Sequence, residues 1–195
     1  MSAPNIAEGS QSEAAKMLSS LPYDWMDRDL LEKQHRAREL LRKYNHTTRK
    51  QAKKRSRILK KLLAETGSDI WIEPPFYCDY GSQITIGDNV YVNFNCTFLD
   101  AAPILIGSGT FIAPNVSIYT ETHSVIAAER LQRGSDLAYP VKIGTNVWIG
   151  GGSIILPGVT VGDNTTIGAG SVVTRAIPAN VVAVGNPSRV IRGLL

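Results

Sequence analysis

The stretch Ile143–Val173 has the sequence IGTNVW IGGGSI ILPGVT VGDNTT IGAGSV V, in which a large aliphatic residue opens every unit of six. These residues are Ile143, Ile149, Ile155, Val161, Ile167 and Val173. The period matches neither an amphipathic helix nor an alternating strand. A six-residue repeat is typical of a parallel β-helix, in which each turn buries its apolar column only by stacking on the next turn.

The fourth and fifth residues of each unit support this interpretation. The fourth is always one of the two residues that most readily adopt positive φ, namely Asn146, Gly152, Gly158, Asn164 and Gly170. The fifth is small or valine and is expected to point into a narrow interior, at Val147, Ser153, Val159, Thr165 and Ser171. Each unit therefore predicts one short strand followed by one corner.

The same pattern extends upstream in two runs. The inward positions are Tyr80, Ile86, Val92 and Phe98 and then, after a shift of two residues around Asp100–Pro103, Ile106, Ile112 and Ile118. The matching corners are Asn89, Asn95, Gly109 and Asn115. The shift predicts one enlarged corner. The period then vanishes and resumes in register at Ile143, which predicts a polar loop at about 119–142 inserted into the coil, where repeat proteins tend to carry function.

The bulk composition limits the class of protein. The chain has 195 residues, of which 43% are hydrophobic and 19% charged, and a formal net charge of +4. It is expected to be globular and soluble, since no apolar run is long enough to span a membrane. Residues 1–16 lack the features of a signal peptide and are expected to form a disordered leader. Two cysteines, Cys78 and the inward-facing Cys96, exclude a disulfide framework or a zinc cluster and favour a cytoplasmic location.

Residues 17–70 form a basic helical segment. Apolar spacings of three, four and seven predict a helix over Asp27–Tyr44, capped by Asp24 or Asp27. A second helix is predicted over Thr48–Glu65. The run RKQAKKRSR raises the possibility of nucleic-acid or membrane binding. Because it lacks interleaved aromatic residues and a recognised motif, we interpret it as a solvated helix face.

Residues 71–195 form the coil. The prolines of Trp71–Tyr77 exclude a helix there, so this segment is expected to be an extended entry into the first turn. At the other end, Val181–Val184 predicts a strand, and Ser188–Arg192 predicts a basic tail packed against the end of the coil.

His123 is the candidate catalytic residue, because it lies in the inserted loop and histidine suits a general base near neutral pH. A single histidine in the coil cannot supply a three-histidine zinc site, so we expect no metal. Asn93 occupies what is expected to be a mid-strand position, where asparagine is disfavoured. It is therefore a candidate ligand contact. Asp79 and Asp100 are nearby acids, with solvated corner positions as the alternative interpretation.

Several blocks resemble the maltose/galactoside O-acetyltransferase family, and the basic helices resemble the N-terminal domain of that family. The blocks are Tyr80–Ile84, Asn93–Asn95, Thr120–His123, Asn146–Gly151 and Gly185–Ile191. The resemblance covers roughly residues 17–195. The hexapeptide repeat alone specifies only the fold, whereas the blocks together specify the family. Asp79 stands where some members have a small hydroxyl residue, and Ala101 where some have a second acid, so the acceptor side departs from the family pattern.

The resemblance implies a mainly β protein, a left-handed parallel β-helix with a small N-terminal helical segment, that forms a homotrimer. It implies acetyl-CoA in a cleft between neighbouring coils and His123 as the base that takes a proton from a sugar hydroxyl. Asn93 matches the acceptor-site asparagine of the family and is assigned a catalytic role with it. The implied acceptor contacts are Asp24, Asp79, Tyr91, Asn93 and Asp100. The implied coenzyme contacts are Ala113, Trp148, Gly151, Ala169, Thr174, Arg175, Arg189 and Arg192.

We therefore expect an acetyl-CoA-dependent O-acetyltransferase acting on a sugar, with no nucleic-acid or membrane partner. One alternative is a non-catalytic scaffold that uses the coil for assembly and the basic helices to dock on an acidic partner. Such a scaffold has no reason to bind acetyl-CoA. The other alternative is an acetyltransferase for a different acceptor, such as serine or an amino sugar, which would share the coenzyme site.

Overall fold

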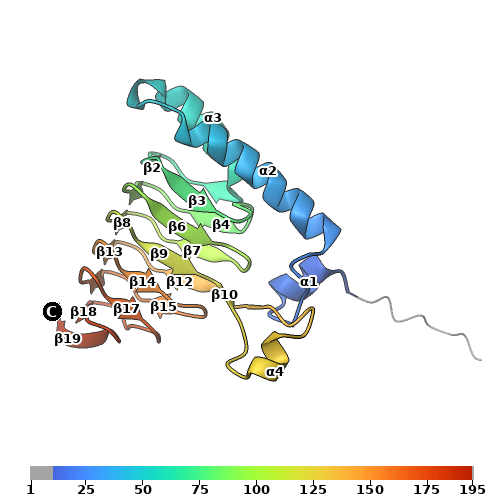
Figure 1. Cartoon of the computed structure of the whole chain (residues 1–195). Coiled ribbons are helices and arrows are strands. Elements are labelled where there is room, and N and C mark those ends of the chain that lie inside the picture. Colours follow the sequence, from blue (N-terminus) through green and yellow to red (C-terminus); the bar gives the residue numbers. More distant parts are fainter. Residues whose placement is uncertain (1–10, 195) are drawn as a thin grey trace, which may run out of the picture.

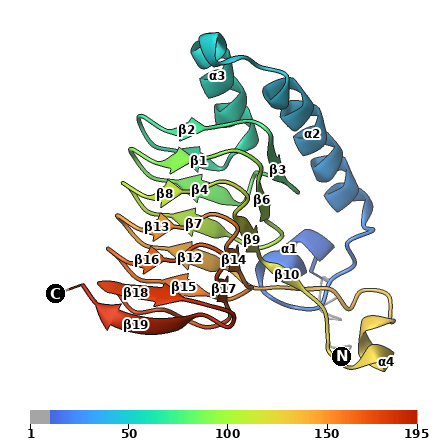
Figure 2. The ribbon, with the colours of Figure 1, turned by 60° about the vertical axis from the view of Figure 1, so that its left-hand side comes forward.

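The chain winds into a triangular coil whose three faces are β-sheets (Figures 1 and 2). Their strands are parallel except for the last one, which pairs antiparallel with its neighbour. This computed structural model describes residues 11–194. Successive turns pair in register, as when Tyr91 of one turn pairs with Phe111 of the next. The hexapeptide pattern therefore predicted the fold correctly.

Each face of the coil takes one strand from every turn. The first sheet has the order β1 (Glu65–Thr66), β4 (Ile84–Ile86), β7 (Ile104–Ile106), β12 (Val141–Ile143) and β15 (Thr160–Val161). The second sheet has the order β19 (Arg189–Gly193), β18 (Val181–Val184), β16 (Thr166–Ile167), β13 (Trp148–Ile149), β8 (Phe111–Ile112), β5 (Tyr91–Val92) and β2 (Trp71–Ile72). The third sheet has the order β17 (Val172–Val173), β14 (Ile154–Ile155), β9 (Ser117–Tyr119), β6 (Cys96–Leu99) and β3 (Phe76–Cys78).

The corners follow the sequence pattern. All nine predicted corner residues have φ between 54° and 78°, namely Asn89, Asn95, Gly109, Asn115, Asn146, Gly152, Gly158, Asn164 and Gly170. The asparagines also bond to one another along the coil axis, since Asn146 Nδ2 donates to Asn164 Oδ1 over 3.1 Å and Asn164 donates to Asn180 over 2.9 Å. Asparagine is therefore favoured at these corners both by its tolerance of left-handed backbone and by these ladders.

The inward column is buried as predicted. All thirteen predicted inward residues are buried, and so are the five fifth-position residues Val147, Ser153, Val159, Thr165 and Ser171. Cys96 and Cys78 are buried and unpaired. The narrow interior therefore explains why these positions alternate between large aliphatic and small residues.

The prediction of one enlarged corner was incomplete. Equivalent residues are 20 apart in the early turns, as Asn95 and Asn115 are, but 18 apart in the late turns, as Asn146 and Asn164 are. The extra residues lie in two stacked corners, after β3 and after β6. The side chain of Asp100 joins these corners by accepting hydrogen bonds from the backbone N–H groups of Asp79, Tyr80 and Gln83.

The N-terminal helices cover the first turns of the coil (Figure 1). They are α1 (Glu13–Leu18), α2 (Arg28–Asn45), the 3₁₀ helix η1 (Arg49–Gln51) and α3 (Ala52–Leu62). Asp27, one of the two predicted caps, accepts hydrogen bonds from the N–H groups of Asp29 and Leu30. Apolar residues of α2 and α3 join the core of the coil, including Leu41, Tyr44 and Leu59. The helices therefore close the open end of the coil.

Three predicted boundaries need correction. The second helix was predicted over Thr48–Glu65, but its first turn is η1 and it ends at Leu62. The coil begins at β1, before the predicted boundary at residue 71, because Glu65 pairs with Thr85. Residues 1–10 of the predicted leader lie outside the described residues, and its end is wrong because α1 starts at Glu13.

The basic run is not entirely a solvated face. Most of its side chains are exposed, but Arg55 is buried and forms an ion pair with the equally buried Glu73, with Nη1 and Oε2 3.1 Å apart. The Arg55 Nε–H also donates to Thr47 Oγ1. Within residues 11–194, no helix is both long and apolar enough to cross a bilayer.

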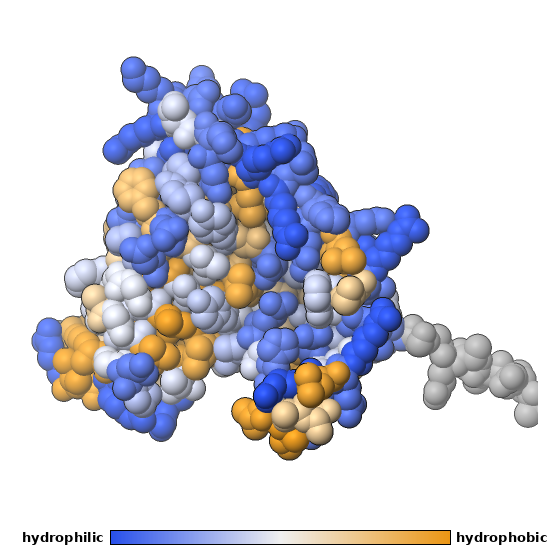
Figure 3. Space-filling view, in the orientation of Figure 1, coloured by the Kyte–Doolittle hydropathy of each residue, from blue (hydrophilic) through white to orange (hydrophobic). Residues whose placement is uncertain are grey.

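The inserted loop forms its own small structure between β9 and β12. Strands β10 (Glu121–Thr122) and β11 (Leu137–Ala138) pair antiparallel, and the short helix α4 (Ala127–Arg130) lies at the tip. The loop was predicted to be polar, but its tip exposes Val125 and Leu131, which are 93% and 82% accessible (Figure 3). Backbone hydrogen bonds between Tyr23 and Asp136 tie the loop to the segment before α2.

Candidate active site

His123 directly follows β10 and carries the chemistry that the loop can offer. Its Nδ1 lies 3.2 Å from Asp136 Oδ1, and its side chain is 62% exposed. The Asp136 carboxylate faces Nδ1 and so favours the tautomer that carries its proton there, in which Nε2 is left as an acceptor. In that tautomer the mostly exposed ring offers Nε2 as a proton acceptor, the group that general-base catalysis requires.

Asp136 was not found from the sequence. It is held by the paired backbone hydrogen bonds Tyr23 N–H to Asp136 O, of 3.1 Å, and Asp136 N–H to Tyr23 O, of 3.2 Å. Its carboxylate faces His123 because β10 and β11 fold back on each other. The one sequence feature that could have pointed to it is its position as an acid in the same inserted loop.

His123 and Asp136 border a cavity of about 350 Å³ between the loop and α2. Its other lining residues are Tyr23, Trp25, Gln34, Arg38, Glu121 and Thr122. Trp25 is 45% exposed beside the catalytic candidate, and the sequence analysis did not single it out. A half-exposed indole in a polar cavity offers an apolar platform next to hydrogen-bonding groups.

Two interacting carboxyl groups have raised pKa values, namely Glu121, which lines this cavity, and Asp79, which is near Glu121. Burial, together with the nearby Glu121 and Asp100, raises the pKa of Asp79 to about 7. Burial also raises the pKa of Glu121, although the Tyr23 hydroxyl donates to it over 3.0 Å and opposes the shift. The Asp79 Oδ2 atom is buried without a hydrogen-bond partner. This arrangement fits a group that would receive a polar ligand atom.

Asp100, assigned from the resemblance as an acceptor contact, has a structural role in this chain. Its side chain is fully buried, and both of its carboxylate oxygens are already bonded to backbone N–H groups of the enlarged corner. Burial raises the pKa of Asp100 to about 6, against the lowering effect of those N–H groups. An acid is favoured at this position because its carboxylate pairs with the backbone N–H groups of the extra residues in the enlarged corner.

Asp24 borders this region and is already paired. Its Oδ2 accepts from Arg133 Nε over 2.5 Å, and its Oδ1 accepts from the N–H of Met26. The Arg133 guanidinium lowers the pKa of Asp24. Asp24 thus joins the N-terminal segment to the inserted loop.

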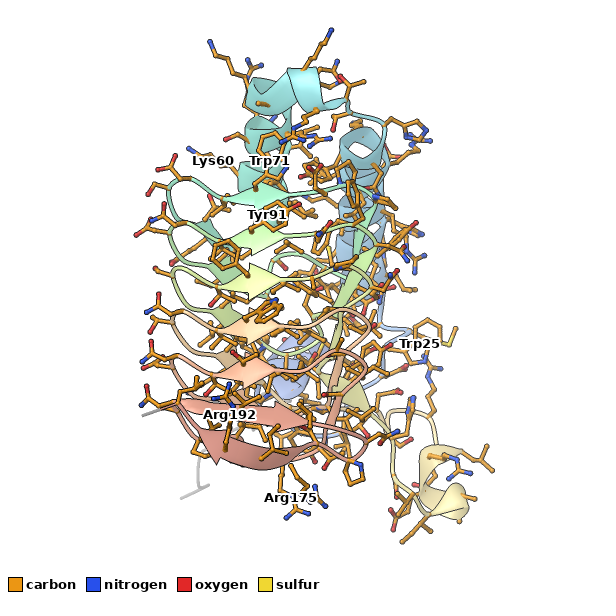
Figure 4. All side chains as sticks on the ribbon, turned by 90° about the vertical axis from the view of Figure 1, so that its left-hand side faces the viewer. Trp25, Lys60, Trp71, Tyr91, Arg175 and Arg192 are labelled. Carbon is orange, nitrogen blue, oxygen red and sulfur yellow. The ribbon has the colours of Figure 1, made fainter. Side chains whose placement is uncertain are left out.

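A second concave surface lies on the β2–β19 face of the coil. It is a groove of about 440 Å³ lined by Tyr91, Asn93, Phe111, Ile112, Ala113 and Trp148. Tyr91 and Trp25 lie on different sides of the coil (Figure 4). Within one chain the structure therefore separates the predicted site into two parts, with His123 on one side and Asn93 on the other.

The reasoning that singled out Asn93 was wrong in one respect. β5 ends at Val92, so Asn93 follows the strand and does not lie inside it. Its Oδ1 accepts from the N–H of Phe94 over 2.8 Å, which gives asparagine a local structural role at this position. Its place in the groove nonetheless leaves it available to a ligand.

The remaining coenzyme candidates continue from this groove toward the C-terminal end of the coil. A Cβ atom at Gly151 would lie 3.2 Å from the carbonyl oxygen of Pro114, so the backbones approach closely there. Ala169, Thr174, Arg175, Arg189 and Arg192 are exposed. The three arginines form no ion pair with any residue in 11–194. They are therefore free to meet phosphate groups.

Among residues 11–194, no three His, Cys, Asp or Glu side chains are grouped so that they could hold a metal ion.

Comparison with known proteins identifies the family. Residues 16–67 match the maltose acetyltransferase hexapeptide capping motif, and residues 140–175 match the bacterial transferase hexapeptide (six repeats). The chain is 46% identical over 163 residues to the galactoside O-acetyltransferase of Escherichia coli (strain K12), a match that covers 84% of this chain and 80% of that protein.

Solved structures agree along almost the whole chain. A maltose O-acetyltransferase from Clostridium difficile 630 superimposes with a TM-score of 0.93 at 46% identity, covering 95% of this chain and 98% of that one. A galactoside acetyltransferase in complex with coenzyme A gives a TM-score of 0.91 at 42% identity, covering 95% of this chain and 92% of that one. The chain belongs to the maltose/galactoside O-acetyltransferase family of hexapeptide-repeat acetyltransferases.

Proposed function

We propose that this acetyltransferase moves the acetyl group of acetyl-CoA to a hydroxyl group of a sugar, with His123 as general base. The observation that carries the proposal is the His123–Asp136 pair, whose Nδ1 and Oδ1 atoms lie 3.2 Å apart and whose two side chains border a polar cavity. The coenzyme part is supported by the related galactoside acetyltransferase that was solved with coenzyme A.

The proposed reaction is a direct transfer. His123 Nε2 accepts the proton of the acceptor hydroxyl while its oxygen attacks the thioester carbonyl carbon. The resulting oxyanion intermediate collapses, the C–S bond breaks, and the imidazolium returns the proton to the leaving thiolate. Asp136 stabilises the imidazolium and fixes the ring orientation. Asn93 contacts the acceptor or the developing oxyanion.

The acceptor would occupy the cavity beside His123. The indole of Trp25 offers a surface for the apolar face of a pyranose ring. Asp79 does not line the cavity but interacts with Glu121, which does, and would offer its unpaired carboxylate oxygen to a sugar hydroxyl. Tyr91 and Asn93 would approach this acceptor from a second chain. Asp24 would support this site indirectly, because its hydrogen bond with Arg133 joins the N-terminal segment to the inserted loop.

We propose a homotrimer because one chain carries only part of the site. Three chains around a common axis would set the groove of Asn93 and Trp148 against the His123 loop of the neighbouring chain. The exposed apolar tip of the loop, with Val125 and Leu131, supports assembly because such a patch is unfavourable in water. The unpaired buried cysteines fit the reducing conditions of the cytoplasm.

In this assembly the coenzyme would run along the groove toward the C-terminal end of the coil. Ala113, Gly151 and Ala169 leave room for the narrow pantetheine arm beside backbone groups. Trp148 would pack against it. Arg175, Arg189 and Arg192, with the Thr174 hydroxyl nearby in the chain, would bind the phosphates of coenzyme A.

An acceptor screen with labelled acetyl-CoA tests the proposal. Acetylation of a maltose-, glucose- or galactoside-type sugar supports it. Preferential acetylation of serine or of an amino-sugar nitrogen would replace the acceptor assignment. Failure to bind acetyl-CoA in calorimetry would favour a non-catalytic scaffold. Size-exclusion chromatography with light scattering measures whether the chain is a trimer.

A further inference from the structure

A cavity of about 540 Å³ lies between α3 and the first turn of the coil, and neither catalysis nor the comparisons account for it. One wall is α3 and the other is the segment from Thr66 to Ile72, which includes β2. The volume falls within the range of known small-molecule sites. Figure 4 shows Lys60 of α3 beside Trp71 of β2, at the opposite end of the coil from Arg175 and Arg192.

We propose that this cavity is a binding site for a small organic anion, a phosphate or carboxylate group attached to an apolar body. It is separate from the acetyl-transfer site. Two independent observations support this proposal: an unsatisfied hydrogen-bond donor on one wall, and unpaired positive charge on the other.

The unsatisfied donor is the indole Nε1–H of Trp71. This atom is buried and has no hydrogen-bond partner, although Trp71 lines the cavity. Leaving a buried donor unpaired is unfavourable, and folded proteins rarely retain one without a partner. An indole N–H can only donate, so its missing partner must be an acceptor atom such as an anionic oxygen.

The positive charge comes from Lys53, Arg57 and Lys60. Their spacings of four and three residues set them along one face of α3, and all three line the cavity. All three are exposed, and none forms an ion pair with another residue of the described chain. One acid, Asp69, also lines the cavity, so the net charge of the lining favours an anion.

Arg55 and Arg49 also lie near Trp71, but we assign them to packing against its indole ring and not to the positive charge of the cavity. The Arg55 guanidinium lies 5.1 Å from the Trp71 ring centre and is neutralised by its buried ion pair with Glu73. The Arg49 guanidinium lies 5.9 Å from the same ring. The indole is therefore fixed by cation–π contacts. The aliphatic side chains of Leu59, Ile70 and Ile72 border the same space and would contact an apolar body.

Titration calorimetry of the full-length protein with phenyl phosphate, benzoate and neutral benzyl alcohol tests the proposal. We expect at least one of the two anions to bind and the alcohol not to bind; comparison of the anions tells which head group is preferred. Trp71→Phe keeps an aromatic ring but removes the N–H group, and should weaken binding roughly 10-fold or more, the effect of a lost charge-assisted hydrogen bond.

A charge-matched pair of variants separates a site from general attraction. Replacing Lys53, Arg57 and Lys60 by glutamine should abolish binding. Replacing Lys50, Lys54 and Lys61 by glutamine removes the same charge from positions outside the cavity lining and should leave binding within about twofold. Absence of binding to both anions, or equal losses in the two triple variants, would overturn the proposal. Trp71→Phe should retain wild-type acetyl transfer, so the outcome is independent of the proposed reaction.

Discussion

The coil from Ile143 to Val173 and the inserted loop between β9 and β12 are built on opposite principles. In the coil each residue repeats a role that its neighbour six positions away also performs, so burial and backbone conformation follow from sequence position. In the loop each role occurs once, and His123 meets Asp136 only because β10 and β11 pair. The coil therefore supplies stability, while the loop holds the side chains to which we assign the chemistry in the proposed reaction.

The largest expected effect comes from a substitution in the loop, which should lower the activity of the protein without lowering its stability. His123→Ala should lower kcat roughly 10²–10⁴-fold, the usual contribution of a general base. Because the ring is mostly exposed, the thermal midpoint and the affinity for acetyl-CoA should change little. Steady-state kinetics, calorimetry and thermal denaturation measure these three quantities. Normal turnover by the variant would remove His123 from the mechanism.

In the coil we expect the opposite, namely that a substitution lowers the stability of the fold. Ile155→Ala should lower the free energy of unfolding by about 2–5 kcal/mol, because Ile155 is fully buried and its truncation leaves a cavity. Its neighbour Ile154 is only partly buried and is the matched control, for which a smaller loss is expected. Chemical denaturation gives both values. Equal losses at the two positions would contradict the inward column.

Asp136→Asn tests whether His123 and Asp136 act as a pair. The asparagine retains the shape but cannot stabilise an imidazolium as a carboxylate does, so kcat should fall roughly 10–100-fold, less than for a fully buried triad aspartate. The pH profile of kcat should change while KM for acetyl-CoA is retained. A fall in stability accompanied by an unchanged pH profile would assign Asp136 a purely structural role.

Asp79 lies in the enlarged corner between β3 and β4 and interacts electrostatically with Glu121 of the loop. Because its pKa in the folded state is raised from 3.8 to about 7, the folded chain holds this proton more tightly than the unfolded chain does. Its contribution to stability is thus present at low pH and is lost as the pH rises from about 4 to 7.

Asp79→Asn should remove the loss of stability that wild type shows as the pH rises. After discounting for its partly accessible position, we expect the variant to be more stable than wild type by roughly 1–2 kcal/mol at pH 8 and similar to it at pH 4. Its KM for the acceptor should rise, because the carboxylate oxygen is absent. Thermal denaturation across this pH range measures the first effect and acceptor kinetics the second. A difference that does not vary with pH would contradict the raised pKa.

The smallest effect is expected at a single corner of the coil. Asn146→Ala should cost about 1–2 kcal/mol, because φ at this residue is 54° and the hydrogen bond to Asn164 is lost. Asn146→Gly tolerates the same φ and loses only the hydrogen bond, so it should cost less than the alanine variant. Denaturant unfolding of both variants separates the two contributions.

The corners and inward residues could be predicted from the sequence because the coil uses only local rules. A residue six positions along the chain meets the same environment, and asparagine or glycine is needed wherever φ is positive. The boundaries at Glu13, Leu62 and Glu65 were less predictable because packing of the helices against the first turn decides where they end. The helix and strand propensities of single residues do not include this packing of the helices against the first turn.

The site was predictable only in part. His123 and Asn93 were singled out from their positions in the repeat pattern, and Trp148 through a block that resembles the family. The structure places these residues on two different faces. Asp136, Trp25 and Glu121 were not chosen, since nothing in their spacing shows that they line one cavity. Asp100 was chosen for the wrong reason, because the sequence shows an acid but not the backbone N–H groups that surround it.

The sequence by itself determined the repeat, the corners, the buried column and the family of this protein, since each depends on residues that lie a few positions apart. The tertiary structure decided which carboxylate orients His123, which acid is buried in a corner, and which cavities exist. Those features depend on contacts between residues as far apart as Tyr23 and Asp136, and such contacts arise only when the coil, the helices and the loop pack together.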